Sequence, residues 1–344
     1  MIRVFLSHEP EALENFYGSR AIRELKEFAE VRINDSGRVL TTAMLQDGFK
    51  GCDVVVLDRN TPADAAFFAG CPDIVSVHRC AVDIRTIDVT AGSRAGVLVT
   101  NASPGFTDAV VELSLGLMID LARTISSYVS NYRRDAPSPA RMGAQLSGSV
   151  IGIIGYGGIG ARLAEVAHTI GMTVLAHDPY KTIADGRVRQ TGLEELLGES
   201  DFVNCLAVAT PETENLMNEK AFAAMKDGAY FINVSRGNLV DEAALEGALA
   251  SGHIAGAAID VGRAGDQKPS PGLARLPKVI ATPHIGGQTL AAIESQALET
   301  VEQIRAVSQG ALPHNAINPD RAFRFAEFLQ RRASSELPND RSNC

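Results

Sequence analysis

Short apolar runs alternate with amphipathic stretches along most of the chain. Four runs in the first hundred residues have the length of buried strands: residues 2–6, 53–57, 73–78 and 96–100. Residues 11–29 carry apolar side chains at helical spacing, which predicts a single helix there. Strands that alternate with helices in this way predict a parallel sheet covered on both faces.

A second series of the same kind begins at Ser149. Its predicted strands are short apolar runs at residues 150–154, 173–177, 202–207, 229–234, 255–259 and 278–281. Helical patterns separate them at residues 158–170, 193–197, 218–225 and 242–251. The chain is predicted to be helical again at 291–308. The sequence therefore predicts the α/β class, with two series of parallel strands.

Three other segments differ from this alternation. Residues 108–123 are apolar nearly all round, which is typical of a helix buried between layers or at an interface. Residues 133–141 are polar and contain two prolines, which predicts a surface connection. The charged residues 331–344 are predicted to form a frayed tail.

Composition and charge limit the class of protein. The 344 residues are 45% hydrophobic and 21% charged, which is enough for about two packed domains. The 41 acidic and 32 basic residues give a net charge of −9 without a basic cluster, which argues against nucleic acid as a partner. Because the sequence shows neither a signal-peptide pattern nor a run of ~18 apolar residues, we expect a soluble, cytoplasmic protein with no membrane partner.

The cysteines and histidines suggest neither a disulfide framework nor a metal site. Five cysteines are scattered along the chain without a C-x-x-C pair, which fits a reducing compartment. The histidines show no metal-ligand spacing, so we expect no metal.

One motif predicts a dinucleotide site. A buried strand runs into G-x-G-x-x-G, in which Gly155 permits the tight turn, Gly157 lets the backbone approach a pyrophosphate and Gly160 lets the next helix pack closely. The helix N-terminus offers N–H groups and a positive dipole end to the phosphates. The residues expected to hold the cofactor here are Gly155, Tyr156, Gly157, Gly158, Ile159 and Gly160.

An acidic residue follows the next predicted strand. Asp178 lies 23 positions after Gly155, near the spacing of a carboxylate that holds the adenosine ribose 2′-OH. This carboxylate would repel a 2′-phosphate, which favours NAD over NADP. Arg187 and Arg189 lie downstream and leave NADP as the less favoured alternative.

Three polar residues follow later strands at their carboxyl ends: Arg236, Asp260 and His284. Ligands of open parallel sheets bind at this edge, so we expect the side chains to converge near the nicotinamide. Arg236 suits a carboxylate, and His284 suits proton transfer to a carbonyl oxygen, which together fit a 2-oxo acid. Taken singly, Arg236 could be a surface ion-pair residue, Asp260 could cap the next segment and His284 could be a loop histidine.

These features together resemble the D-isomer-specific 2-hydroxyacid dehydrogenase family. The resemblance extends roughly from Asp73 to Val307. The motifs that carry it are the 155–160 loop, Asp178, V-S-R-G at 234–237, D-E-A-A-L at 241–245 and T-P-H-I-G-G at 282–287.

The resemblance implies a particular architecture. An NAD-binding Rossmann-like domain at 102–289 would be inserted into a flavodoxin-like substrate domain made of 1–101 and 290–330. It also implies homodimers and an active site between domains. Further residues implied to lie around the cofactor are Thr107, Val208, Thr213, Val234, Ser235, Asp260 and Gly286.

The chain departs from the family beside the catalytic histidine. Family members carry a glutamate five residues after the aspartate that matches Asp260, and it pairs with the histidine. Gly265 stands there in this chain. The adjacent Asp266 is either a substitute catalytic partner or a solvated loop acid. Without a carboxylate neighbour, protonated His284 should be less favoured than in the family, so reduction of a carbonyl should be favoured at lower pH.

The predicted substrate loop, residues 80–88, also departs from the family. Two glycine-type positions are filled, and Arg85 stands where an acid is usual. Arg85 either binds a second anionic group of the substrate or forms an ion pair with Asp83 or Asp88. The residues expected to contact substrate are Arg79, Ala81, Val82, Arg85 and Arg236.

The sequence thus predicts an NAD-dependent oxidoreductase that interconverts a small anionic 2-hydroxy acid and its 2-oxo acid. Two alternatives stay open. One is an NAD(H)-binding sensor or regulatory protein with weak or lost catalysis, which the missing glutamate motivates. The other is a dehydrogenase of the same fold with a different donor, such as the formate and phosphite dehydrogenases of this family.

Overall fold

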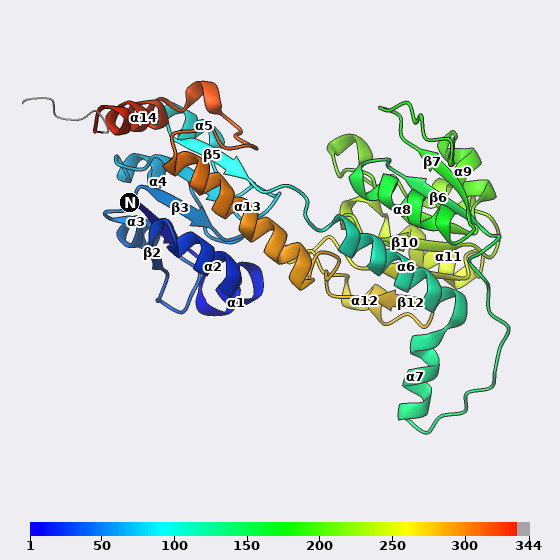
Figure 1. Ribbon diagram of the computed structural model, residues 1–344. Coiled ribbons are helices and arrows are strands. Elements are labelled where there is room, and N and C mark those ends of the chain that lie inside the picture. Colours follow the sequence, from blue (N-terminus) through cyan, green and yellow to red (C-terminus); the bar gives the residue numbers. More distant parts are fainter. Residues whose placement is uncertain (336–344) are drawn as a thin grey trace, which may run out of the picture. The chain divides into compact units, whose positions relative to one another are not determined.

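Two sheets organise the chain, one in each of two units (Figure 1). The computed structural model describes residues 1–335. Unit 1 comprises residues 1–105 and the segment that begins at Thr289, and unit 2 comprises Phe106–Gln288. Within the described residues, all strand pairs of both sheets are parallel. The predicted α/β class with two parallel-sheet domains is confirmed.

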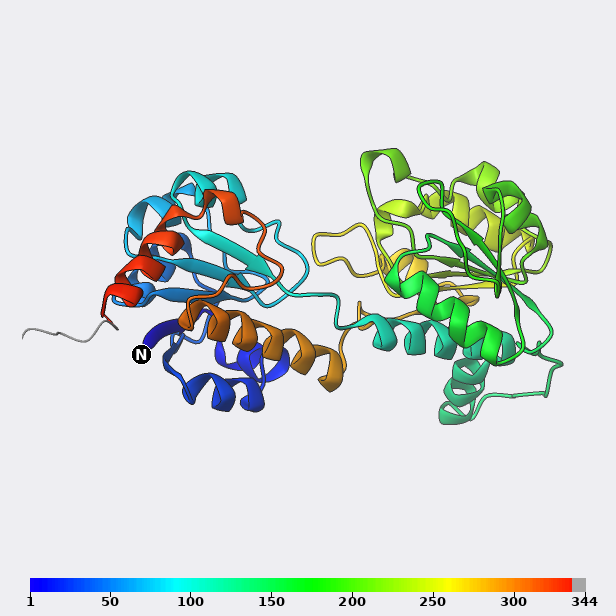
Figure 2. The same ribbon diagram turned by 45° about the horizontal axis from the view of Figure 1, so that its top comes forward.

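The sheet of unit 1 has the order β2-β1-β3-β4-β5. Its strands are β1 (Ile2–Leu6), β2 (Ala29–Ile33), β3 (Val54–Leu57), β4 (Ser76–Arg79) and β5 (Leu98–Asn101). Helices cover both of its faces (Figure 2). One face packs against α1 (Pro10–Phe16), α2 (Ser19–Lys26) and α13 (Leu290–Ser308), and the other against α3 (Thr42–Phe49), α4 (Ala65–Gly70) and α5 (Val89–Arg94).

The single helix predicted for residues 11–29 is wrong. Gly18 has a φ of +84°, which glycine adopts without the steric cost that a side chain brings, and it separates α1 from α2. The helical pattern then ends at Lys26, and β2 begins at Ala29. β2 pairs with β1 and alternates apolar with charged residues, a period of two that the sequence analysis missed.

The C-terminal segment completes the core of unit 1. α13 buries Val301, Ile304 and Val307 against the sheet. Gln303 on the same helix lies 3.2 Å from the ring nitrogen Nδ1 of the buried His78 in β4. The last helix, α14 (Phe323–Ser335), includes residues 331–335, where the sequence predicts a frayed tail. The remainder of that predicted tail lies outside the described residues.

The sheet of unit 2 has the order β12-β11-β10-β9-β6-β7-β8. The strands are β6 (Val150–Ile154), β7 (Thr173–His177), β8 (Val188–Gln190), β9 (Phe202–Cys205), β10 (Tyr230–Asn233), β11 (Gly256–Ile259) and β12 (Val279–Ala281). The order reverses between β6 and β9. In doubly wound sheets, dinucleotides bind at the carboxyl ends of the strands at this reversal.

Helices cover both faces of the second sheet as well. α6 (Thr107–Arg123) and α8 (Gly158–Thr169) lie on one face, and α9 (Leu193–Glu199), α10 (Glu219–Ala223), α11 (Glu242–Ser251) and α12 (Pro271–Ala274) pack on the other. The sequence analysis missed α7 (Ile125–Arg133) and the three-residue edge strand β8. In the part of the chain that the structure describes, no helix has the length and hydropathy needed to cross a membrane.

Candidate active site

The glycine turn lies at the carboxyl end of β6, beside the reversal of strand order. Gly155 has a φ of +96°, and a Cβ there would lie 2.7 Å from backbone atoms of Ala207. A Cβ on Gly160 would collide with the carbonyl oxygen of Gly155. Both positions therefore require glycine, one for the turn and one for the close packing of α8 on β6.

The middle of this turn faces open space. A Cβ on Gly157 or Gly158 would meet no atom of the described residues within 4 Å. Gly157 is the N-cap of α8 and, as a glycine, supplies no side-chain cap to the N–H groups of its first turn. Uncapped donors at the positive end of a helix suit an anion. The residues present therefore fit the pyrophosphate of a dinucleotide.

Asp178 is fixed next to this turn. Its carboxylate oxygens accept hydrogen bonds from the backbone N–H of Tyr156 at 2.9 Å and of Tyr180 at 3.0 Å. The two downstream arginines are bound to carboxylates. Arg187 donates to Asp185 at 2.9 Å, and Arg189 lies 2.7 Å from Glu195.

Arg236 lies just beyond the carboxyl end of β10, with its side chain exposed. Asn233 accepts a hydrogen bond from the N–H of Ser235 and donates one to the carbonyl of Arg236, at 3.1 and 3.0 Å. Gly237 packs so closely on the backbone of Gly262 that a Cβ would collide with it. The backbone that presents the Arg236 guanidinium is thus held on both sides.

His284 follows β12, and Asp260, which directly follows the neighbouring strand β11, holds its segment. Asp260 is 1% exposed and accepts hydrogen bonds from the Thr282 hydroxyl at 2.6 Å and from the N–H groups of Ile285 and Gly286 at 2.8 Å each. His284 itself has a φ of +60°. The carboxylate of Asp260, predicted to lie around the cofactor, thus holds the Thr282 side chain before His284 and the backbone of Ile285 and Gly286 after it.

The other residues expected around the cofactor lie on the same edge of the sheet or next to it. The Ser235 hydroxyl donates to the carbonyl of Ala207 at 2.7 Å, and the Thr213 hydroxyl donates to that of Val208 at 2.7 Å. Val208 is 76% exposed, which leaves an apolar side chain on the surface after β9. Val234 is buried, and Thr107 is the first residue of α6.

The loop that follows Asp260 has its own contacts. Asp266 accepts a hydrogen bond from the N–H of Lys268 at 3.2 Å, and the Lys268 ammonium lies 3.8 Å from it. Arg263, which the sequence analysis missed, donates to Glu214 at 2.6 Å and to the carbonyl of Val240 at 2.9 Å. Arg263 therefore anchors this loop to the chain before and after β10. The residues around Arg263 in the sequence carry no signal of that role.

In unit 1, Arg79 is buried rather than available to a ligand. Its guanidinium donates to the carbonyls of Asp58, Arg59 and Asp83 and to the Thr86 hydroxyl. Burial lowers the pKa of Arg79 to about 10. The geometry gives Arg79 a structural role at the carboxyl edge of the sheet and does not support the expected contact with substrate.

Arg85 forms the ion pair with Asp83 that one of its two predicted alternatives describes. It donates to both carboxylate oxygens of Asp83, with a shortest contact of 2.7 Å. Ala81, next to it in the expected substrate loop, is buried, whereas Val82 is 36% exposed.

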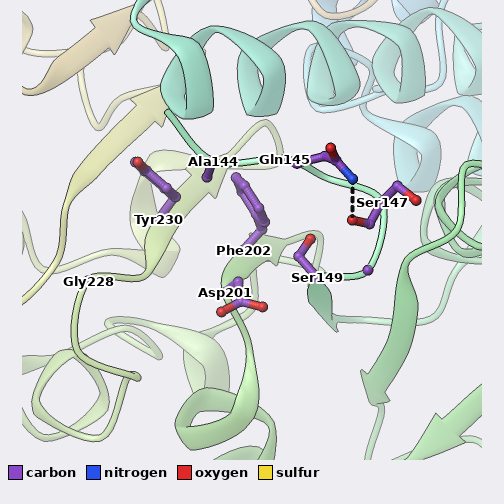
Figure 3. Close-up of a pocket in the computed structure, with 9 residues that line it drawn as sticks. Ala144, Gln145, Ser147, Ser149, Asp201, Phe202, Gly228 and Tyr230 are labelled. Carbon is purple, nitrogen blue, oxygen red and sulfur yellow. Dashed lines mark hydrogen bonds between the residues drawn. The ribbon is translucent and has the colours of Figure 1, made fainter. Parts of the chain in front are cut away.

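A cavity of about 450 Å³ lies away from these residues, at the amino ends of β6, β9 and β10 (Figure 3). Phe202 and Tyr230 stack there with ring centroids 5.2 Å apart. The chain segment 144–149 forms its other wall. The predicted site residues do not line this cavity.

The sheet of unit 2, its glycine turn and its carboxyl-edge residues define a nicotinamide-dinucleotide-binding domain. The sequence model of the D-isomer specific 2-hydroxyacid dehydrogenase NAD binding domain matches residues 115–286. The chain belongs to the D-isomer specific 2-hydroxyacid dehydrogenase family, and unit 2 carries the NAD-binding domain of that family.

Individual relatives agree with this assignment. The chain is 33% identical to D-3-phosphoglycerate dehydrogenase of Methanocaldococcus jannaschii over 303 residues, covering 87% of this chain and 57% of the relative. It is 33% identical to hydroxypyruvate reductase of Thermotoga maritima, covering 73% of this chain and 83% of the relative. D-lactate dehydrogenase of Escherichia coli has a similar structure, with a TM-score of 0.77 at 25% identity, covering 92% of this chain and all of the other. The chain spans about half the length of the D-3-phosphoglycerate dehydrogenases it matches.

Proposed function

We propose that the protein is an NAD-dependent oxidoreductase that interconverts a small 2-hydroxy acid and its 2-oxo acid. The observation that carries this proposal is that the predicted cofactor and substrate residues lie at one common edge of a single sheet. The glycine turn after β6, Arg236 after β10 and His284 after β12 all follow the carboxyl ends of parallel strands. Ligands of doubly wound sheets bind at that edge.

The cofactor would be held by the glycine turn and Asp178. The N–H groups of the α8 N-terminus would bind the pyrophosphate, and the Asp178 carboxylate would accept a hydrogen bond from the adenosine ribose. When bound, NAD supplies or accepts the hydride.

Arg236 and His284 would act on the substrate. The planar guanidinium of Arg236 matches both oxygens of a carboxylate and orients the acid for reaction. His284 would give a proton to the carbonyl oxygen during reduction and take it back during oxidation. Asp260 is a positioning residue, because its carboxylate fixes the segment that presents His284.

The relatives act, by their names, on 3-phosphoglycerate and hydroxypyruvate. We infer a substrate with a single carboxylate, because Arg85, the side chain suited to a second anionic group, is neutralised by Asp83. We also propose that the active protein is a homodimer, as the family resemblance implies, and that it works in the cytoplasm.

The test is an assay of NADH oxidation with a panel of 2-oxo acids that includes glyoxylate, hydroxypyruvate and its phosphorylated form. We expect turnover with monocarboxylates and no gain from a second anionic group. His284→Asn should lower kcat by about 10²- to 10⁴-fold, and Arg236→Gln should lower kcat/KM by about 10- to 100-fold. The exposed residues His168 and Arg275 provide matched controls, His168→Asn and Arg275→Gln. The absence of turnover across the panel would refute the proposal.

A second candidate is an NAD(H)-binding sensor. Gly265 removes the carboxylate that pairs with the histidine in the family, and Asp266 is bound to Lys268. Tight binding of NADH without turnover of any 2-oxo acid would favour this candidate.

A further inference from the structure

The charge of Arg187 is neutralised next to the predicted ribose site. Its Nε and Nη2 atoms donate to the two carboxylate oxygens of Asp185, each at 2.9 Å. Its Nη1 atom lies 3.7 Å from the Glu165 carboxylate. All three guanidinium nitrogens therefore face carboxylate oxygens. The contact with Arg187 holds the pKa of the Asp185 carboxyl well below its usual range.

Tyr156 connects this ion pair to Asp178. The backbone N–H of Tyr156 donates to Asp178 at 2.9 Å, and its phenol hydroxyl donates to Asp185 at 3.1 Å. One residue of the glycine turn thus contacts both carboxylates. The Asp185–Arg187 pair lies one tyrosine side chain away from the expected 2′ position of the ribose.

A second cation lies at the same place. The Lys181 ammonium donates to the carbonyl oxygen of Tyr156 at 3.1 Å. Lys181 is exposed and follows Asp178 closely along the chain. Two cations therefore lie around Tyr156. Lys181 contacts its carbonyl oxygen, and Arg187 is bound to the Asp185 carboxylate that the Tyr156 hydroxyl also contacts.

A dinucleotide with a 2′-phosphate needs both a cation that binds the phosphate and relief from nearby carboxylates. We propose that Asp185 is a second determinant of cofactor specificity, because it withholds Arg187 from the ribose 2′ position. Preference for NAD then depends on two carboxylates: Asp178 repels the phosphate, and Asp185 occupies the arginine that would bind it. This inference rests on the proposed NAD site and extends it to a latent 2′-phosphate site formed by Arg187 and Lys181.

Neither single change should be sufficient. Asp178→Asn removes the repulsion but leaves Arg187 bound to Asp185. Asp185→Asn removes the carboxylate that binds Nε and Nη2 of Arg187, so that only Glu165, 3.7 Å from Nη1, still faces this arginine. It leaves the Asp178 carboxylate at the expected 2′ position. The two substitutions should therefore be coupled and not additive, as expected for groups that share one partner.

The experiment is a double-mutant cycle read out by binding, not by turnover. Dissociation constants of NADH and NADPH are measured by titration calorimetry for the unchanged protein, Asp178→Asn, Asp185→Asn and the double variant. We expect each single variant to strengthen NADPH binding by at most about threefold, and the double variant to strengthen it by about 30-fold or more. Addition of Arg187→Gln to the double variant should abolish the gain.

Glu195→Gln is the matched control, since it loosens a different arginine, Arg189, from one of its two carboxylates. It should leave the binding of both cofactors unchanged. Thermal melts verify that each variant folds, and Asp185→Ser replaces Asp185→Asn if the latter does not. Additive effects, or a gain that survives Arg187→Gln, would overturn the inference. Failure of the unchanged protein to bind NADH would instead overturn the proposed function.

Discussion

At the scale of single residues, the conformation of His284 depends on Asp260. A φ of +60° is unfavourable for a residue with a side chain, and such strain persists where surrounding contacts enforce it. The hydrogen bonds that Asp260 accepts from Ile285 and Gly286 enforce it here. The strain therefore lies at the proposed proton donor itself, and the hydrogen bonds that offset it are accepted by Asp260, just after the neighbouring strand β11.

Asp260→Asn should disturb this arrangement. In either orientation of the amide, at least one donor of the 282–286 segment faces an N–H group instead of an oxygen. We expect a loss of stability of about 1–3 kcal/mol and a fall in kcat of about 10- to 100-fold. Denaturant unfolding and kinetics at saturating NADH measure the two effects. Thr282→Val removes one hydrogen bond and should have a smaller effect on kcat; a wild-type kcat in Asp260→Asn contradicts the positioning role.

Asp266→Asn tests the loop acid next to Gly265. Because Asp266 is bound to Lys268, we expect the variant to keep the wild-type pH dependence of kcat/KM. Lys268→Gln removes the ammonium partner of Asp266 and should likewise keep the wild-type pH dependence of kcat/KM. A shift of the profile in Asp266→Asn alone would show that Asp266 serves His284 as its carboxylate partner.

At the scale of elements, two glycines of one turn should respond differently to a methyl group. Gly155→Ala places Cβ against the Ala207 backbone at a positive φ, so we expect a loss of about 2–4 kcal/mol in the free energy of unfolding. Gly157→Ala meets open space at an ordinary φ and should fold normally. Its Cβ would lie where a pyrophosphate approaches, so NADH affinity should fall by about tenfold or more. Equal NADH affinity in Gly157→Ala and the unchanged protein would contradict the assigned phosphate position.

Features encoded locally could be predicted from the sequence, and features that depend on distant partners could not. The β6–turn–α8 unit carries its own signal, because the glycines and the apolar strand are contiguous. The burial of Arg79 had no such signal in the sequence, since its hydrogen-bond acceptors come from residues 58, 59, 83 and 86. The ion pair of Arg85 was among the predicted alternatives, because Asp83 lies only two residues away along the chain. The edge strands β2 and β8 are half exposed, so the alternation of apolar and polar residues that would predict them from the sequence is weak.

At the scale of the whole molecule, two buried histidines should make stability depend on pH. His8 and His78 are at most 1% exposed, and burial lowers the pKa of each to about 4. The unfolded chain binds protons at these residues at higher pH than the folded chain. Their contribution is therefore intact above about pH 6.5 and is lost as the pH falls towards 4, by about 1.4 kcal/mol per pH unit for each histidine.

Denaturant unfolding between pH 7 and pH 4 measures this slope. His78→Gln should make the slope shallower by about one proton, even if it lowers stability at neutral pH. The exposed His168→Gln is the control and should leave the slope unchanged. An unchanged slope in His78→Gln would mean that His78 binds its proton in the folded protein as readily as in the unfolded one.

The place of α13 in the chain has a consequence for synthesis. The strands of unit 1 end at Asn101, but α13, which packs with α1 and α2 on one face of their sheet, begins at Leu290. A chain that leaves the ribosome from its N-terminus presents the part of this apolar face that α13 covers long before α13 exists. Unit 2 is contiguous from Phe106 to Gln288, so all of its strands emerge before α13. The part made second can finish folding first, and nascent residues 1–105 are the stretch that most needs protection by a chaperone.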